Sequence, residues 1–147
     1  MRSQEPENAA TLADLQHGRR GSWMEQEIDP RFQEAIDLFN AREFFACHDV
    51  LEEIWGETLA GREFYQGLIH AAVALFHFGE GNLGGARKMA GSAIRYLEPF
   101  QPACRGVDVE RLIGEFRACF AELLAPHTAY PAGLILNEQR IPRIHQL

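Results

Sequence analysis

Basic residues are few and scattered in this chain of 147 residues. Lysine and arginine number 14 against 21 aspartates and glutamates, which gives a formal net charge of −7. No run of basic residues is longer than two. Proteins that bind nucleic acids or anionic membranes generally need clustered Lys and Arg to neutralise phosphates. The composition therefore excludes a general nucleic-acid binder and a membrane-surface binder.

Cysteine and long apolar runs are also scarce. Cys47, Cys104 and Cys119 form no CxxC pair, and their odd number leaves one thiol unpaired whatever the bonding. This usage is typical of a reducing compartment. No segment approaches the roughly 20 apolar residues of a membrane span, and the first residues lack the apolar core of a signal peptide. We therefore expect a cytoplasmic protein without a membrane segment.

Alternating strand patterns of useful length are absent too, which leaves helical periodicity as the organising signal. Apolar residues recur at three- and four-residue spacing in five segments, and Gly, Pro or Asn residues separate these segments. The expected helices span about 30–40, 43–55, 62–78, 83–98 and 108–125. We predict an all-α fold, a compact bundle of about five helices built from two antiparallel helical hairpins plus a C-terminal helix.

The length favours one domain with a tail at each end. Residues 1–28 are polar with weak apolar periodicity and are interpreted as a largely disordered extension. Residues 29–125 form the helical domain. Residues 126–147 are interpreted as an extended tail in which Leu134–Leu136 pack on the bundle. At the end of the first helix, Asn40 is a plausible left-handed stop.

Polar residues interrupt the apolar faces of the second and third predicted helices at matching positions. His48 and Glu52 are four residues apart, as are Gln66 and His70, so the members of each pair are neighbours on one helix flank. The short connection predicts that the two helices pack antiparallel. Counted from Leu59, Glu52 and Gln66 are each seven residues away. His48 and His70 are each eleven residues away, so the two pairs should face each other across a pocket.

Two interpretations of this pocket remain open. Two imidazoles and a carboxylate from facing helices suit a divalent transition metal such as zinc, iron, manganese or nickel, with His48, Glu52 and His70 as ligands. Such a centre would favour a metal-dependent hydrolase, although Glu52 could act as ligand or as general base but not obviously as both. Alternatively, the four polar residues form a buried network that satisfies itself and fixes the helix register.

The wider set of residues predicted to bind a small ligand extends along both helices. It comprises His48, Glu52, Trp55, Gln66, His70 and His77. Within this set His77 is placed outside the metal centre. Seven residues of helix separate it from His70, which corresponds to about 10 Å along the helix axis.

Two segments of the sequence carry a resemblance to a known family. They are FFACHDVLEEIW and FYQGLIHAAVALFHFGEGNLGGARKMAGSAIRYL. Together they resemble DUF309, a family of small bacterial and archaeal helical proteins, over about Asp29 to Leu124. The resemblance rests on His48, Asp49, Leu51, Glu52, Trp55, Gln66, Gly67, His70, His77, Gly81, Asn82 and Ala86. The family name denotes a domain of unknown function, so the resemblance implies a compact helical bundle and no established activity.

The hairpin of the third and fourth predicted helices is also similar to a tetratricopeptide unit. Ala74, Gly81, Ala86 and Ala93 have the spacing that lets the two helices of such a unit pack closely. This similarity implies an alternative function, a protein-interaction or homodimerisation module whose polar network is purely structural. One good unit and a degenerate one are too few for a solenoid, since repeat arrays normally need about three.

Overall fold

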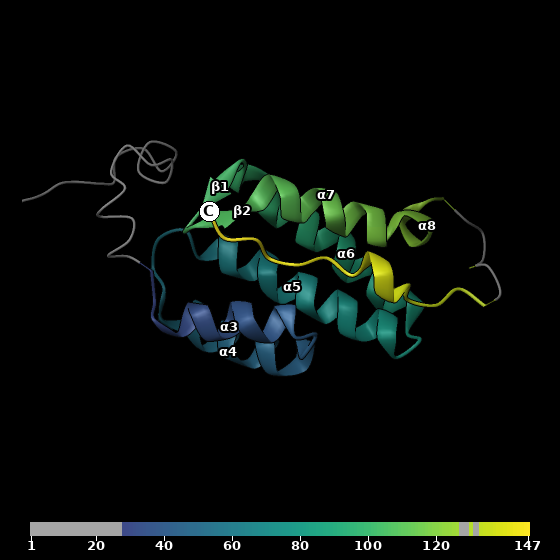
Figure 1. Ribbon diagram of the computed structural model, residues 1–147, viewed down its shortest axis with the longest axis horizontal. Coiled ribbons are helices and arrows are strands. Elements are labelled where there is room, and N and C mark those ends of the chain that lie inside the picture. Colours follow the sequence, from purple (N-terminus) through teal and green to yellow (C-terminus); the bar gives the residue numbers. More distant parts are fainter. Residues whose placement is uncertain (1–27, 127–129, 131–132) are drawn as a thin grey trace, which may run out of the picture.

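The computed structural model describes residues 28–126, 130 and 133–147, so the extension predicted for residues 1–28 lies, except for Ile28, outside the described residues. Helices dominate the described part of the chain, which confirms the predicted all-α class (Figure 1). The helical elements are α3 (Arg31–Asn40), α4 (Phe44–Glu57), α5 (Arg62–Gly79), α6 (Leu83–Leu97), η1 (Glu98–Phe100), α7 (Val109–Cys119), α8 (Ala121–Leu124) and η2 (Glu138–Arg140). The short strands β1 (Ala103–Cys104) and β2 (Val107–Asp108) form an antiparallel hairpin where only a loop was expected.

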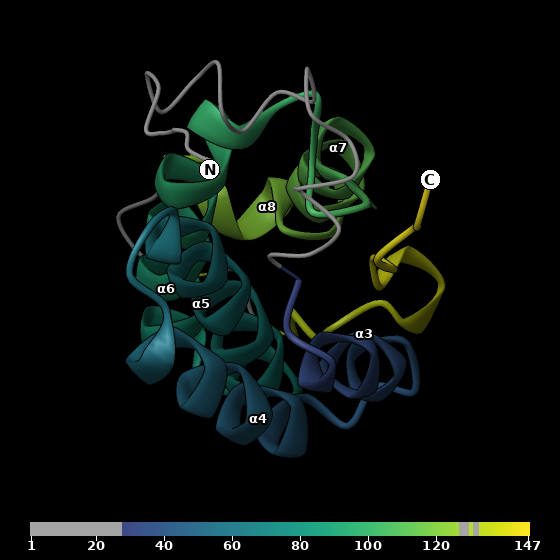
Figure 2. The same ribbon diagram turned by 90° about the vertical axis from the view of Figure 1, so that its left-hand side faces the viewer.

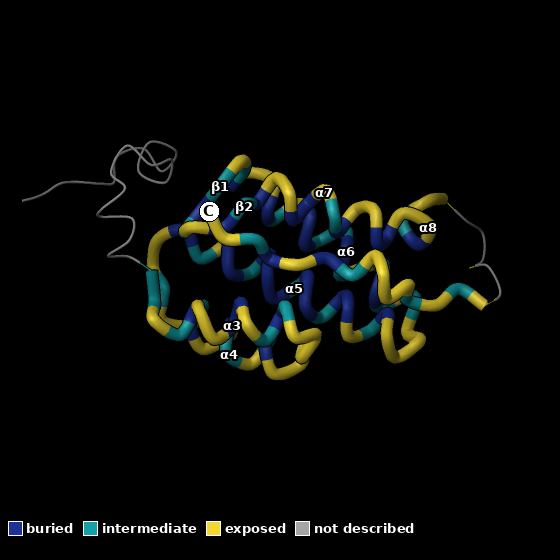
Figure 3. The backbone as a smooth tube through the Cα atoms, in the orientation of Figure 1, coloured by how far each residue is buried: buried dark blue, intermediate teal, exposed yellow. Residues whose placement is uncertain are grey.

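Helices α4, α5 and α6 follow one another as a layer, with α5 in the middle. Figure 2 shows them along one side of the molecule, with α3, α7 and the C-terminal segment on the other side. The α5 helix is the most buried of the three because its apolar residues cover most of its circumference (Figure 3). Gly67 allows α6 to approach α5, since a Cβ atom at this position would lie 2.7 Å from the Cγ atom of Leu97. The antiparallel packing of α4 and α5 places the site described below.

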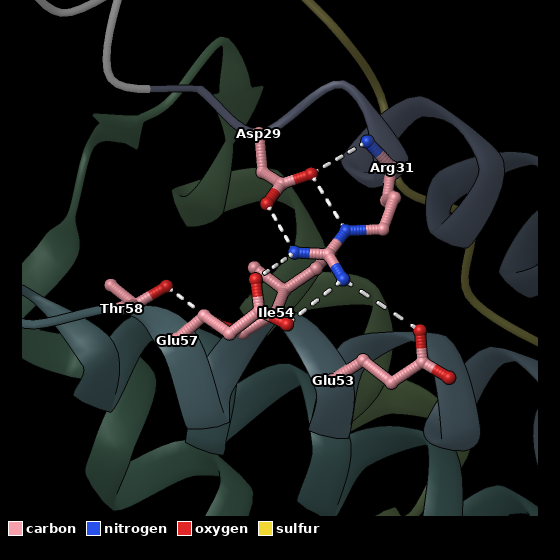
Figure 4. A network of polar contacts seen from close by, with 6 residues as sticks. All are labelled: Asp29, Arg31, Glu53, Ile54, Glu57 and Thr58. Atoms are coloured by element: carbon pink, nitrogen blue, oxygen red, sulfur yellow. Dashed lines mark hydrogen bonds and ion pairs between the residues drawn. The ribbon is translucent and has the colours of Figure 1, made fainter.

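A network of charges ties the start of α3 to the C-terminal half of α4 (Figure 4). The Asp29 carboxylate accepts a hydrogen bond from the backbone N–H of Arg31 at 2.8 Å and from its guanidinium at 2.7 Å. Arg31 also pairs with Glu57 at 2.8 Å and with Glu53 at 3.7 Å. The hydrogen bonds from Arg31 lower the pKa of Asp29. Their contribution to stability is therefore present at neutral pH and is lost as the pH falls through the acidic range in which Asp29 protonates.

The prediction that Asn40 is a left-handed helix stop is wrong. The residue with positive φ is Arg42, at 65°. Asn40 instead uses its side chain to hold the C-terminal segment: its Nδ2 atom donates to the Ile144 carbonyl at 3.0 Å, and its Oδ1 atom accepts from the Ile144 N–H at 2.8 Å. The predicted packing of the tail holds for Leu134 and Leu136, whereas Ile135 is exposed. A residue 104 positions away decides the role of Asn40, and local sequence rules cannot detect it.

We expect Asn40→Ala to loosen the C-terminal segment and to lower the free energy of unfolding by about 1–2 kcal/mol, because two hydrogen bonds are lost and the buried groups of Ile144 lose their partners. Hydrogen exchange should show faster exchange of the Ile144 amide. Gln33→Ala is a suitable control, since the hydrogen bonds of Gln33 to Gln146 are exposed. Equal exchange at Ile144 in both variants would contradict this role of Asn40.

The last predicted helix is interrupted. It was expected to continue to about residue 125, but α7 ends at Cys119 and the short α8 begins at Ala121. The break lies at Phe120, which is fully buried, stacks on Phe116 at 4.5 Å and contacts Phe78 at 5.2 Å between ring centroids. No Gly or Pro marks this position, so only the tertiary packing reveals it. None of the helices in the described part of the chain combines the length and hydropathy needed to cross a lipid bilayer.

Candidate functional site

An open groove of about 220 Å³ lies on the outer face of the α4, α5 and α6 layer. Its lining consists of His48, Glu52, Trp55, Gln66, Ile69, His70, Val73 and Met89. The two polar pairs thus meet in one groove, as their distances from Leu59 predict, and Trp55 lies beside them. Apolar side chains from α5 and α6 form the rest of the wall. Of the six residues predicted to bind a ligand, His77 alone is not among the lining residues.

The α4 helix has two neighbouring stripes, and the second one faces the groove. Phe44, Cys47, Leu51 and Ile54 are buried and face the core. The residue after each of these core residues points to a different side of α4, because successive residues of a helix are about 100° apart. This second stripe runs through Phe45, His48, Glu52 and Trp55 at spacings of three, four and three residues. The same helix therefore supplies a core face and a groove face.

His70 on α5 is held by a neighbour on each side. The Nε2 atom of Gln66, which can only donate, lies 3.1 Å from the Nε2 atom of His70, so this ring nitrogen is the acceptor. The Nδ1–H group then donates to the Ser92 hydroxyl on α6 at 2.6 Å. Burial and the nearby charge of Arg95 lower the pKa of His70. Both effects favour the uncharged ring. Nothing in the sequence pattern identified Ser92 as a partner.

His48 on α4 lies between two carboxylates. Its Nε2 atom is 3.2 Å from Glu52 Oε2, and its Nδ1 atom is 3.3 Å from Asp49 Oδ1. The contact with Asp49 lacks hydrogen-bond geometry, so the buried Nδ1 atom has no hydrogen-bond partner among the described residues. Donor atoms of these three residues lie within 4.8 Å of one another. This compact group contains Asp49, and it does not contain His70, the third ligand in the predicted metal set.

His77 lies in the last turn of α5. Its Nδ1 atom is 3.4 Å from the Nδ2 atom of Asn82. Asn82 caps α6 by accepting a hydrogen bond from the Gly85 N–H at 3.1 Å. His77 therefore supports the start of α6, and its predicted part in ligand binding has no contact with the groove to support it.

Two further groups near the groove have structural explanations. The Arg62 guanidinium stacks on the Trp55 ring at 3.9 Å, which fixes one end of the groove. Cys47 is buried, its thiol lies 3.3 Å from the Ala35 carbonyl, and burial raises its pKa to about 12. A thiol with this pKa is not a nucleophile at neutral pH, so Cys47 does not form a reactive pair with its neighbour His48.

The fold and the groove define a small helical domain with one open, mixed polar and apolar site on its outer face. Residues 32–89 match the model of DUF309, described as a domain of unknown function. Over this segment, which carries all eight lining residues of the groove, the resemblance to DUF309 noted from the sequence is confirmed.

The chain is also similar to two proteins described as uncharacterised. It is 29% identical over 92 residues to YpuF of Bacillus subtilis, and this match covers 60% of the chain and 53% of YpuF. It is 33% identical over 94 residues to a protein of Aquifex aeolicus, which covers 63% of the chain and 27% of that protein. The chain thus spans about half or less of the length of these relatives. No solved structure matches the chain.

Proposed function

We propose that the chain is a metal-binding protein whose groove takes a divalent transition metal through His48, Glu52 and His70. The observation that carries the proposal is the 3.2 Å separation of His48 Nε2 and Glu52 Oε2 at the groove wall. Two donors that each lie about 2.1 Å from one metal are about 3.0 Å apart at a right angle and about 3.4 Å apart at the tetrahedral angle. This pair therefore already has the spacing of two ligands of one ion.

His70 is the third ligand in this proposal. Its Nε2 lone pair faces the Gln66 amide, and a metal would replace that single neutral hydrogen bond, whose net contribution is only about 1 kcal/mol. Its Nδ1–H group is oriented by Ser92, and imidazoles that bind metals usually donate their second nitrogen to an oxygen in this way. The lowered pKa of His70 favours the neutral form, which is the form that binds metals. Closure around the ion requires the side chains of α4 and α5 to move toward each other.

The test is metal content. Protein purified without chelator should contain near-stoichiometric metal by elemental analysis, and Zn²⁺ or Ni²⁺ should bind again after chelator treatment. His48→Ala and Glu52→Ala should abolish binding, and His70→Ala should weaken it at least tenfold. Asp49→Asn is the matched control, because it removes a neighbouring charge and leaves the ligands intact. Binding should weaken below about pH 6, where protons compete for imidazole ligands.

Two results would refute the metal site. The first is a chain without metal in which His48→Ala only lowers the melting temperature, since the polar residues would then form a structural network. The second is loss of metal in Asp49→Asn with full retention in His70→Ala, since the ligands would then be the compact group on α4. Hydrolysis would also need a general base, and Glu52 cannot obviously act as both ligand and base. We therefore propose metal binding without assigning a reaction.

The reducing, cytoplasmic location is part of the same proposal, supported by three free thiols among the described residues.

A second candidate function is an interaction or homodimerisation module. It is favoured by an aromatic pair beside the groove, in which Phe45 is 57% exposed, Phe76 is 36% exposed and the two ring centroids are 5.4 Å apart. Large exposed apolar groups that cluster on one face often mark a contact surface. The similarity to a tetratricopeptide unit remains a prediction. Light scattering that shows a monomer at high protein concentration would exclude the homodimer.

A further inference from the structure

The outer face of the α4, α5 and α6 layer carries opposite charges on its two sides. On α4 the outward stripe is Phe45, Asp49 and Glu52, at spacings of four and three residues. Among the described residues neither carboxylate pairs with a Lys or Arg. We call the two acidic residues of this stripe, Asp49 and Glu52, the acidic rim. The groove and the Phe45–Phe76 aromatic pair lie between this rim and α6.

The opposite side of the face is basic. On α6, Lys88, Ser92 and Arg95 have the same spacing of four and three residues, and Ser92 is fixed on the groove side by its hydrogen bond to His70. Lys88 and Arg95 are exposed, and neither has an ion pair with any described residue. We call this stripe the basic rim. The face is therefore mixed polar and apolar along its middle and charged with opposite sign at its two edges.

The charges of the two rims lie at the same level along the groove. The His70–Ser92 hydrogen bond and the facing of His48 and His70 place these three residues at one level of the layer. Asp49 is one residue beyond that level on α4. The Arg95 side chain folds back over its own helix, so that its guanidinium would lie 3.6 Å from a Cβ atom at Gly91. The guanidinium is thus near the level of Asp49, on the other side of the groove.

We propose that two copies of this chain pack face to face through these rims, about a two-fold axis parallel to α5. Rotation about such an axis leaves each residue at the same height along α5 and places the α4 side of one copy opposite the α6 side of the other. Asp49 of each copy therefore meets Arg95 of the other copy, so this pair forms twice. An axis across α5 would instead place one acidic rim against the other, which is unfavourable. The charges therefore select the first arrangement. This inference rests on the second candidate function and adds the partner and the contacts.

The size of the face agrees with a weak dimer. The α5 helix has 18 residues and is therefore about 27 Å long. Three helices with axes about 8–10 Å apart give a face of roughly 600 Å² per copy, or about 1,200 Å² in total. This total is at the lower end of the range for specific interfaces. We expect dissociation in the micromolar range, with the aromatic pair in the centre and the rims at the edge.

The experiment is a charge exchange followed by analytical ultracentrifugation of the full chain. Asp49→Arg alone places two basic rims together, and Arg95→Asp alone places two acidic rims together, so each variant should dissociate at least tenfold more readily than the parent chain. An equimolar mixture of the two variants should restore association, because every contact in the mixed dimer again joins opposite charges. Phe45→Ser should also weaken the dimer. Glu110→Arg, an exposed change on α7, is the matched control and should leave association unchanged.

Three outcomes would overturn the arrangement: a parent chain that stays monomeric at every concentration, a dimer that persists in both single variants, or a mixture that does not recover. Phe45 is not a proposed metal ligand and its replacement by serine changes no charge beside His48 or His70, so the metal content of Phe45→Ser should equal that of the parent chain. A parent chain that binds metal but stays monomeric would refute this inference alone. A parent chain that dimerises through these contacts but contains no metal would refute only the metal site.

Discussion

Replacing Phe64 by alanine is expected to lower the free energy of unfolding by about 3–5 kcal/mol, because the change leaves a cavity in the core. Phe64 is fully buried, and its ring meets Phe32 of α3 at 5.8 Å, Tyr65 of α5 at 5.4 Å and Phe100 of η1 at 5.6 Å between centroids. The ring thus joins three elements that are distant in sequence. Since domains of this size are stable by only about 5–15 kcal/mol, the loss is a large fraction of the total.

Urea unfolding followed by circular dichroism measures this loss, and the melting temperature should fall by roughly 10–20 °C. Leu59→Ala is the matched control. Leu59 is 94% exposed in the loop between α4 and α5, so its replacement should change stability by less than about 0.5 kcal/mol. If Phe64→Ala lowered the free energy of unfolding no more than Leu59→Ala does, the Phe64 ring would not join α3, α5 and η1 in the core as described.

Replacing Gly67 or Gly114 by alanine is expected to change the free energy of unfolding in opposite directions. In α5, a Cβ atom at Gly67 would lie 2.7 and 2.8 Å from two carbon atoms of the Leu97 side chain and 3.1 Å from Tyr96 Cβ. Leu97 is buried, so a shift of its side chain would disturb the core around it. Gly67→Ala should therefore cost about 1–3 kcal/mol from overpacking, reduced by the gain in helix propensity. In α7, a Cβ atom at Gly114 meets nothing within 4 Å.

Gly114→Ala should consequently stabilise the protein by about 0.5–1 kcal/mol, because alanine loses less conformational entropy in a helix than glycine does. The two variants should thus shift the urea midpoint in opposite directions. Equal and positive shifts would show that α6 does not approach α5 as closely as the distances to Leu97 require. The groove depends on this approach, because His70 reaches Ser92 only when the two helices are close.

The main helices follow from periodicity because each has one continuous apolar face and clear punctuation by Gly, Pro or Asn. The facing of His48 and His70 was also predictable, since a short loop between antiparallel helices fixes which residues share a level. The exact partners were not. Ser92 binds His70 from the third helix of the layer, and the sequence has no rule for the rotation of α6 about its own axis. Asp49 was missed as a neighbour of His48 Nδ1 for a related reason, because side-chain rotamers rather than helical spacing decide that contact.

The helix break at Phe120 and the role of Asn40 in holding the C-terminal segment could not be predicted for a different reason. Both depend on contacts with residues far away in the chain, Phe78 in one case and Ile144 in the other. Local preferences at these positions favour a continuous helix and a left-handed stop, and tertiary packing overrides both.

Ile69 lines the groove and, at 6% exposure, also belongs to the buried core cluster. The α5 helix therefore contributes both to the groove and to the core. A redesign of the groove would therefore have unequal costs on its three helices. Changes on α5 would disturb the packing below, whereas exposed positions on α4 and α6 can be altered while their buried stripes stay intact. A library that varied only Phe45, Asp49, Lys88 and Arg95 should yield folded proteins with new binding preferences. In this fold, binding specificity can be changed through the exposed residues of α4 and α6, whereas the α5 residues beneath the groove have to be kept.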